Sequence, residues 1–254
     1  KTTGIKLHVD LIAGLPYEGF ESFKCSFDDV YNLYPQEIQL GFLKLLKGTR
    51  LRRDAHKYGI VYRSKPPYEI LYSKDISYQE LCVLSGIEWL LDKYYNTGRF
   101  QHSLRYLCDK FQRPFDLYMA FYDFWKEHKL FQALHSLKAQ YEILYAFAQS
   151  LGAYMDLFSD ILKFDFMLTS SKAAVPDCIK LYENREFHER AKHYLYNKEW
   201  LEANMPQALK LTGRKLHNQV TYGLFRYDVP QSIHRKDKGV IFFQMEGKSF
   251  YAEF

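Results

Sequence analysis

A strict alternation of apolar and polar positions runs over residues 6–13. Leu, Val, Leu and Ala share one face of this segment, and His, Asp and one Ile share the other, a period of two that is typical of a β-strand. We expect the first face to pack on helices and the second to face a cavity. After Gly14-Leu15-Pro16, apolar residues recur at helical spacing over residues 20–34, and residues 37–46 alternate again. Strand, helix and strand predict a βαβ unit of a parallel sheet or barrel.

The middle of the chain predicts helices. Residues 50–59 predict a short helix ending at Gly59, and Pro66-Pro67 interrupts regular structure before a short extended segment at 68–72. Ser77 and Glu80 have the spacing of a capping box. From there to about residue 169 the apolar spacing predicts successive helices.

The last third of the chain predicts a loop, further helix and then strands. The loop covers residues 170–177, and helix follows to about residue 211. The final segments, 220–229, 239–245 and 248–254, are β-rich, with a tight hairpin predicted at Glu246-Gly247. The expected fold class is α+β, mostly α-helical: an N-terminal βαβ fragment, then a helical domain that ends in a small β-sheet.

Composition excludes several classes of protein. The net charge of +5 is mild, and basic residues are spread out apart from those in residues 50–57, which argues against nucleic acid as a partner. No apolar run approaches the roughly 20 residues that span a bilayer, so we expect no membrane partner. Four cysteines without metal-ligand or redox spacing predict reduced thiols, a cytoplasmic protein and no metal site: Cys25, Cys82, Cys108 and Cys178.

Residues 9–51 resemble the C-terminal half of a radical S-adenosylmethionine (radical SAM) barrel. The nearest relatives are the cobalamin-binding-domain group and the oxygen-independent coproporphyrinogen dehydrogenase-like enzymes. In these, a D-L-I-x-G-L-P strand end is followed by E-S-F, a helix and a strand ending in L-x-x-x-P-G-T. Lys47 stands where those relatives usually have Pro. The matching residues are Asp10, Leu11, Ile12, Gly14, Leu15, Pro16, Glu21, Ser22, Phe23, Leu43, Gly48 and Thr49.

The segments GTRLRRDAHKYGIVYRSKPPYEIL (residues 48–71) and YYNTGRF (94–100) resemble a domain of unknown function. It is appended to cobalamin-binding radical SAM proteins that are often described as iron–sulfur oxidoreductases. The resemblance implies two domains: residues 1–73 as the C-terminal portion of the barrel, and residues 74–254 as the appended, mainly helical domain with its β-rich C-terminus. The C-x-x-x-C-x-x-C motif that holds the [4Fe–4S] cluster of that family is absent. We therefore expect a C-terminal fragment of a longer enzyme, inactive by itself.

The resemblance also implies cofactors and contacts for the parent enzyme. Its cofactors would be S-adenosylmethionine and a [4Fe–4S] cluster, with cobalamin left open, and none of them bound to this fragment alone. Ile12, Gly14 and Leu15 would form the adenine-side wall of the S-adenosylmethionine site, with room for a side chain at Gly14 toward the cavity. The partners would be the missing N-terminal part of the chain and a substrate that the sequence does not identify. Exposed strand edges predict self-association.

Several residues leave two interpretations open. His8, Asp10 and Gln39 either line the cavity or form a buried polar network, and Asp10 is the better candidate for a structural role. Tyr95, Asn96 and Arg99 form either a functional patch or a helix stop with packing aromatics. The histidines of HERAKH (residues 188–193) fit a solvated helix face better than a metal site. No catalytic residue can be named, and the alternative function is a non-catalytic helical binding or scaffolding module.

Overall fold

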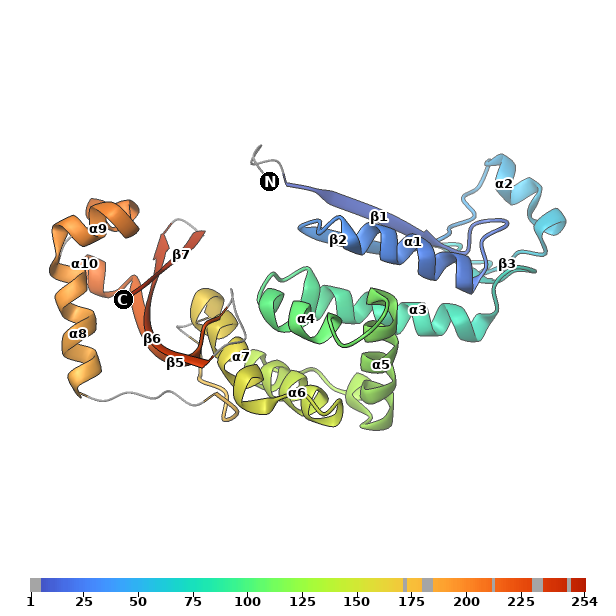
Figure 1. Ribbon diagram of the computed structural model, residues 1–254. Helices are drawn as coiled ribbons and strands as arrows, with labels where there is room; N and C mark the ends of the chain where they lie inside the picture. The colour runs from blue at the N-terminus through green and yellow to red at the C-terminus, as the bar shows by residue number, and fades with distance from the viewer. Residues whose placement is uncertain (1–5, 171–172, 180–184, 212, 230–234, 246–247) are drawn as a thin grey trace. The chain divides into compact units, whose positions relative to one another are not determined.

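The computed structural model confirms an α+β fold that is mostly helical (Figure 1). Among the residues it describes, no helix combines the length and the hydrophobicity that crossing a bilayer requires. The chain divides into two compact units. The described residues are 6–170, 173–179, 185–211, 213–229, 235–245 and 248–254.

The N-terminal βαβ unit forms as its alternating pattern predicts. Strand β1 (His8–Ala13) leads through helix α1 (Phe20–Asn32) to strand β2 (Glu37–Phe42), which pairs with β1 in parallel. The apolar face of each strand is buried at its centre, at Leu11 and Ala13 of β1 and at Ile38 and Leu40 of β2, and is half-buried at Val9 and Phe42. The second strand is shorter than predicted and ends at Phe42. Beyond it the chain turns to a different neighbour, because Lys44 forms an isolated antiparallel bridge with Glu69.

A small helical turn and a hairpin follow β2. Helix α2 (Arg50–Arg53) and the 3₁₀ helix η1 (Ala55–Tyr58) end at Gly59, as predicted, and Gly59 adopts a left-handed conformation. Strands β3 (Val61–Tyr62) and β4 (Ile70–Tyr72) pair antiparallel, which confirms the short extended segment after Pro66-Pro67.

Four helical elements complete the described part of the first compact unit. Helix α3 (Tyr78–Leu90) begins with the predicted capping box and continues into the π-helical η2 (Leu91–Tyr95). Helix α5 (Pro114–Glu127) is followed by the 3₁₀ helix η3 (Leu130–Gln132). Aromatic residues of α5 pack with η2 in a core: Phe121 and Trp125 of α5 and Tyr94 of η2 are each at most 1% exposed, and their rings contact one another. The unit comprises residues up to Gly98 together with Cys108–Gln132.

One carboxylate joins helix α1 to the start of helix α5. Asp28, 9% exposed, accepts from Arg113 Nε at 2.6 Å and from the backbone N–H of Phe115 at 2.8 Å. Helix α5 has no side-chain cap of its own, so Asp28 supplies from α1 the acceptor that a helix N-terminus needs. Beside it, the ring of Phe27 packs edge-on against Phe115 at 5.3 Å between centroids.

The second compact unit packs helices on an antiparallel sheet. It comprises Arg99–Leu107 and Ala133–Phe254. Strands β5 (Val220–Tyr227), β6 (Arg235–Met245) and β7 (Lys248–Glu253) form a meander in that order, as the β-rich C-terminus predicts. The predicted turn at Glu246-Gly247, like part of the predicted loop at 170–177, lies outside the described residues. The helical elements of the second unit are α4 (Gln101–Cys108), α6 (Leu137–Ser150), α7 (Met155–Ser170), α8 (Arg185–Tyr196), α9 (Lys198–Asn204), η4 (Pro206–Lys210) and α10 (Gly213–His217).

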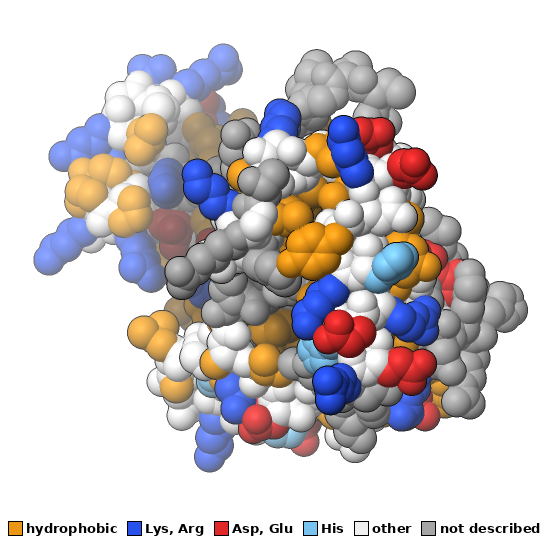
Figure 2. Space-filling model, turned by 90° about the vertical axis from the view of Figure 1, so that its left-hand side faces the viewer, with side chains coloured by type: hydrophobic (Ala, Val, Ile, Leu, Met, Phe, Trp, Pro, Cys, Tyr) orange, Lys and Arg blue, Asp and Glu red, His pale blue; other side chains and the backbone are white. Residues whose placement is uncertain are grey.

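The predicted division into residues 1–73 and 74–254 separates two domains that the resemblance implies, and it stays a prediction. The first compact unit runs past residue 73, because helices α3 and α5 pack with the βαβ unit. The near face of the second unit in Figure 2 shows Lys, Arg, Asp and Glu side chains interspersed rather than gathered by sign.

Candidate functional site

One face of the β1–β2 sheet is exposed and carries most of the residues that the sequence singles out. The parallel register sets His8 beside Glu37, Asp10 beside Gln39 and Ile12 beside Gly41. Gly41 is half-buried, and the other five residues are exposed. The structure therefore brings together His8, Asp10, Gln39 and Ile12, and adds Glu37, which the sequence interpretation did not name although it has the same parity as Gln39. We call these six residues the exposed sheet face.

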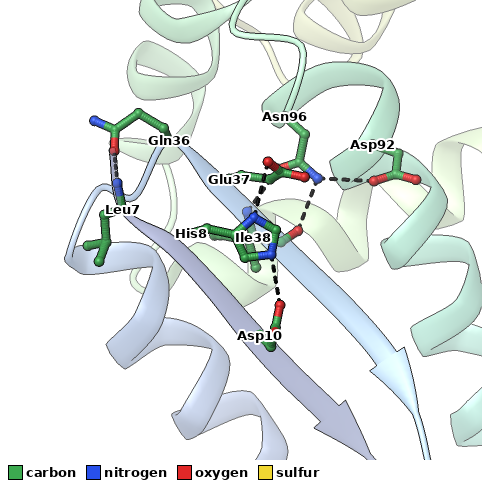
Figure 3. A network of polar contacts seen from close by, with 8 residues as sticks. All are labelled: Leu7, His8, Asp10, Gln36, Glu37, Ile38, Asp92 and Asn96. Carbon is green, nitrogen blue, oxygen red and sulfur yellow. Dashed lines mark hydrogen bonds and ion pairs between the residues drawn. The ribbon is translucent and has the colours of Figure 1, made fainter. Parts of the chain in front are cut away.

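A polar network crosses this face from strand to strand (Figure 3). His8 Nε2 lies 2.8 Å from Asp10 Oδ1, and His8 Nδ1 lies 3.1 Å from Glu37 Oε2. Both ring nitrogens thus face a carboxylate, which favours the imidazolium form that donates from both. The side chains of His8 and Asp10 are 45% and 65% exposed, so the network is a surface feature rather than a buried one. Their role in lining a cavity stays a prediction.

The two carboxylates raise the pKa of His8, with the hydrogen bond to Asp10 as the larger cause and that to Glu37 as the second. A raised pKa in the folded state stabilises the fold fully below the unfolded-state value of about 6.5, and this stabilisation is lost as pH rises through the folded-state pKa. We expect an NMR titration to show Asp10→Asn lowering the pKa of His8 most, and Glu37→Gln less. Asp29→Asn, an exposed carboxylate on α1, is the control. A titration of His8 unchanged in both variants would contradict the network.

The outer edge of β2 is closed by a side-chain amide. Asn96, which follows η2, accepts from the backbone N–H of Ile38 at 2.9 Å and donates Nδ2–H to the Ile38 carbonyl at 3.0 Å (Figure 3). The amide therefore makes both bonds that a neighbouring strand would make with this residue, and Asp92 Oδ1 orients it at 3.0 Å. Tyr95 adds a hydroxyl bond to the Pro35 carbonyl at 2.7 Å. Tyr95 and Asn96 thus belong to one structural contact.

We expect Asn96→Ala to lower the free energy of unfolding by about 1–2 kcal/mol, because the Ile38 N–H and C=O both lose their partner. Urea denaturation measures the loss, and hydrogen exchange at the Ile38 amide localises it. Asn32→Ala, at the exposed end of α1, is the matched control. Unchanged exchange at Ile38 would show that the amide does not protect this edge.

The outer edge of β1 has no strand beside it in the described part of the chain. The carbonyls of Leu7 and Ala13 accept from the β2 side, at 2.9 Å from the N–H of Gln36 and 3.0 Å from that of Leu43. Because main-chain groups alternate in direction along a strand, the N–H and C=O groups of the intervening His8, Asp10 and Ile12 point to the outer edge. The sheet is therefore closed on one side and open on the other.

The loop after β1 is held by residues of β4 and the segment beyond it. Gly14 is buried with φ +89°, and a Cβ there would lie 2.9 Å from Cδ1 and 3.0 Å from Cγ2 of Ile70. The expectation of room for a side chain at Gly14 is wrong, since both the backbone conformation and Ile70 oppose one. Leu15 is 37% exposed, and the N–H of Tyr17 donates to Asp75 Oδ2 at 2.9 Å.

Helix α7 carries buried charges that the sequence interpretation did not single out. Asp160, 3% exposed, accepts from the backbone N–H groups of Arg226 at 2.6 Å and Tyr227 at 3.0 Å, where a bulge interrupts the β5–β6 ladder. Burial raises the pKa of Asp160, and the two N–H donors counteract part of that rise. Lys163, 1% exposed, donates to the Leu224 carbonyl at 2.6 Å. The sequence signal is charged residues inside an apolar helix, and their role here is to hold β5.

Asp165 caps helix α4 from outside that helix. Its side chain is 2% exposed and accepts from the backbone N–H groups of His102 at 3.2 Å and Ser103 at 2.8 Å. It also accepts from Ser103 Oγ and lies against His102 Nδ1, each at 2.7 Å. Because one carboxylate takes both side chains, the three residues do not form a relay from serine through histidine to aspartate.

The histidines of helix α8 do not converge. His188 Nδ1 lies 3.0 Å from the Tyr222 hydroxyl, whereas His193 lines a shallow, open surface depression with Glu189, Lys192 and Tyr196. Across the described residues, no group of three or more His, Cys, Asp or Glu side chains is placed to hold a metal ion. The solvated-face interpretation of HERAKH accounts for His193, and packing on β5 accounts for His188.

Comparison with known proteins finds one family. Residues 56–243 match the family described as "Protein of unknown function (DUF4080)", a match that spans well over half of the 254 residues. It begins within η1 and ends within β6, so it includes Asn96 and the buried charges of α7 and leaves out the β1–β2 sheet. No curated protein matches the chain.

Proposed function

The chain belongs to the DUF4080 family of proteins of unknown function, and with that membership as the starting point we propose that it is the C-terminal part of a radical SAM enzyme. In this proposal the β1–β2 sheet is the last part of the barrel and contributes to the cofactor and substrate cavity. The family domain that follows caps the barrel. The resemblance of residues 9–51 supports the radical SAM assignment.

The asymmetry of the β1–β2 sheet is the observation that carries the proposal. Asn96 occupies the outer edge of β2 at Ile38, whereas the outer edge of β1 has no such partner among the described residues, so further strands are expected beside β1. One sheet face is packed and the other is exposed, with polar and apolar groups in mixed order, as expected for the inside of a barrel that continues beyond β1. The missing N-terminal part of the chain would supply those strands.

The residues fit one of the implied cofactors and not another. Ile12 and Leu15 are 46% and 37% exposed at the C-terminal end of β1, and they offer apolar surface to an adenine ring. Gly14 contributes only backbone, because Ile70 covers the direction of its missing side chain. Once bound and reductively cleaved, S-adenosylmethionine supplies the radical that acts on substrate, and these residues would only hold its adenine.

The cysteines do not fit a [4Fe–4S] cluster. No three of them come together, and burial raises the pKa of Cys108 to about 11 and that of Cys178 to about 12, which disfavours the thiolate that binds iron. The cluster is therefore assigned to the missing N-terminal part of the parent, as is any cobalamin.

The test uses the longer gene product that contains this chain, purified without oxygen. We expect iron and sulfide in the ratio of a [4Fe–4S] cluster, and formation of 5′-deoxyadenosine from S-adenosylmethionine on reduction. Ile12→Glu should weaken cofactor binding at least tenfold, which is about 1.4 kcal/mol. Leu7→Glu is the matched control, because Leu7 is 43% exposed but has the opposite parity to Ile12.

A longer protein that holds no cluster and cleaves no S-adenosylmethionine would overturn the proposal and leave the non-catalytic binding or scaffolding module. Equal loss of cofactor affinity in Ile12→Glu and Leu7→Glu would refute the adenine wall while leaving the enzyme class intact.

We further propose that the chain by itself associates through the open edge of β1. Sedimentation velocity over rising concentration should show dimers or larger species. Asp10→Pro removes an N–H that points to this edge, and it should weaken association at least tenfold because proline is tolerated where its missing donor faces away from the ladder. Asp10→Asn keeps the N–H and is the control. A strict monomer at every concentration would contradict the proposal.

A further inference from the structure

The positive charge of the chain is concentrated in one short segment. Residues 44–74 contain nine Lys and Arg and two Asp and Glu, a formal charge of +7 in a chain whose total is +5. The remaining residues together are therefore slightly acidic, at −2. The mild total conceals a strongly basic region around α2 and the β3–β4 hairpin, which we call the basic surface.

Backbone pairing brings the basic residues of this segment side by side. Lys44 pairs with Glu69 in an isolated bridge, and the N–H of Arg63 donates to the Glu69 carbonyl at 2.8 Å. Lys44 and Arg63 therefore both neighbour Glu69 through the backbone. In the distant lobe at the upper left of Figure 2, which carries α2 and this hairpin, Lys and Arg side chains surround hydrophobic ones with few acids between them. The charge is thus gathered in space as well as in sequence.

Much of this charge is exposed and is not neutralised within the chain. Asp54 pairs with Arg50 and Lys57. The ion pairs found among the described residues include none to Lys44, Lys47, Arg53, Arg63 or Lys65, all of which are exposed. Basic side chains without acidic partners leave a positive potential available to an anionic partner.

Tyrosines are interleaved with these cations. The guanidinium of Arg52 lies 4.6 Å from the ring centroid of Tyr68 and 5.2 Å from that of Tyr62, and its Nη1 donates to the Leu45 carbonyl at 3.0 Å. These contacts hold the Arg52 side chain and the two tyrosine rings against one another on the basic surface. Two other tyrosines are more exposed: Tyr72 at the end of β4, at 46%, and Tyr78 at the start of α3, just after this segment, at 52%.

From these features we infer that the basic surface binds single-stranded nucleic acid. Cations can track a phosphodiester backbone while exposed tyrosine rings stack on bases, a combination that defines sequence-tolerant single-strand binding. An anionic membrane is the weaker fit, because the surface is a short hairpin with tyrosines rather than an amphipathic helix with a broad apolar face. An acidic polypeptide would use the charge and leave the exposed tyrosine faces without a role. The inference goes beyond the proposed function and does not depend on it.

Fluorescence anisotropy with a fluorescein-labelled, mixed-sequence RNA of about 20 nucleotides tests the inference on the 254-residue chain. We expect micromolar binding, typical of contacts that are not sequence-specific. The triple variant Lys47→Glu, Arg53→Glu and Arg63→Glu should bind at least tenfold more weakly. Loss of three phosphate contacts should also reduce the slope of log affinity against log salt concentration by about 2.

A matched triple variant carries the same change in net charge elsewhere: Arg105→Glu, Lys126→Glu and Lys210→Glu, all exposed residues. It should bind RNA within threefold of the unchanged chain. Tyr72→Leu with Tyr78→Leu should weaken binding several-fold without altering the salt slope, since stacking carries no charge. Circular dichroism of each variant confirms folding.

Three outcomes would overturn the inference. The first is equal weakening in both triple variants, which would mean that net charge alone attracts RNA. The second is absence of RNA binding together with binding to vesicles of phosphatidylserine and phosphatidylcholine, which would assign the surface to a membrane. The third is displacement of RNA by polyglutamate as effectively as by unlabelled RNA, which would point to an acidic polypeptide. Equal affinity for DNA of the same sequence supports the inference and leaves the sugar unspecified.

Discussion

Asp165→Ala should lower the free energy of unfolding by at least about 3 kcal/mol. The carboxylate accepts four hydrogen bonds while almost fully buried, two of them from backbone N–H groups in the first turn of α4. Hydrogen bonds to a charged group each contribute about 1.5–3 kcal/mol, and the donors left behind cannot all reach water. Because His102 and Ser103 begin a short helix, losing the cap should also fray α4.

Urea denaturation measures this loss of stability, and two further variants of α7 serve as comparisons. Asp156→Ala removes an exposed carboxylate from the first turn of the same helix, and it should cost less than about 1 kcal/mol. Asp165→Asn keeps one acceptor oxygen and should fall between the two. If Asp165→Ala were no more destabilising than Asp156→Ala, the capping role of Asp165 would be wrong.

Gly14→Val should destabilise the fold by about 3 kcal/mol. A non-glycine residue at a positive φ costs roughly 1–2 kcal/mol, and forcing extra atoms into a packed site costs about 1–3 kcal/mol more. The second contribution arises because the new Cβ meets two atoms of Ile70 at 3.0 Å or less. Thermal and urea unfolding measure the change in this chain without any cofactor.

Two further variants separate the contributions at Gly14. Gly41→Ala is the control, because Gly41 has no positive φ and its added Cβ would meet nothing closer than the Leu11 carbonyl at 3.8 Å. In a protein that already carries Ile70→Ala, adding Gly14→Ala should lower the free energy of unfolding only by the backbone contribution of roughly 1–2 kcal/mol, measured relative to Ile70→Ala alone. A stability unchanged by Gly14→Val would restore the interpretation that the strand end is open toward a cavity.

Sequence patterns predicted the features whose causes are local. The alternation over residues 6–13 predicted which side chains of β1 are buried, because a strand sorts its side chains by parity. Ser77 and Glu80 predicted the start of α3, since both halves of a capping box lie within four residues. The same parity argument placed His8, Asp10 and Gln39 on one face, and applied to Glu37 it would have completed the network.

Contacts between distant parts of the chain were beyond those patterns. Asn96 pairs with Ile38 across 58 residues, and no local signal distinguishes this amide from an ordinary helix stop. Gly14 was interpreted from its own strand, but Ile70, 56 residues later, decides what fits beside it. The basic surface escaped notice for a related reason, because the net charge of the whole chain averages a basic segment with an acidic remainder.

The contact between Asp28 and helix α5 bears on how recombination can divide the gene for this chain. A recombination break between residues 73 and 74 would separate Asp28 from Arg113 and Phe115, and Ile38 from Asn96. The first half would then carry the Asp28 carboxylate without its partners, and the second half would carry the start of α5 without its acceptor. The rings of Phe27 and Phe115, which pack on each other, would both be exposed to water. We therefore expect the two segments to be inherited as a pair, and a replacement for residues 1–73 to be accepted only if it brings an equivalent of Asp28.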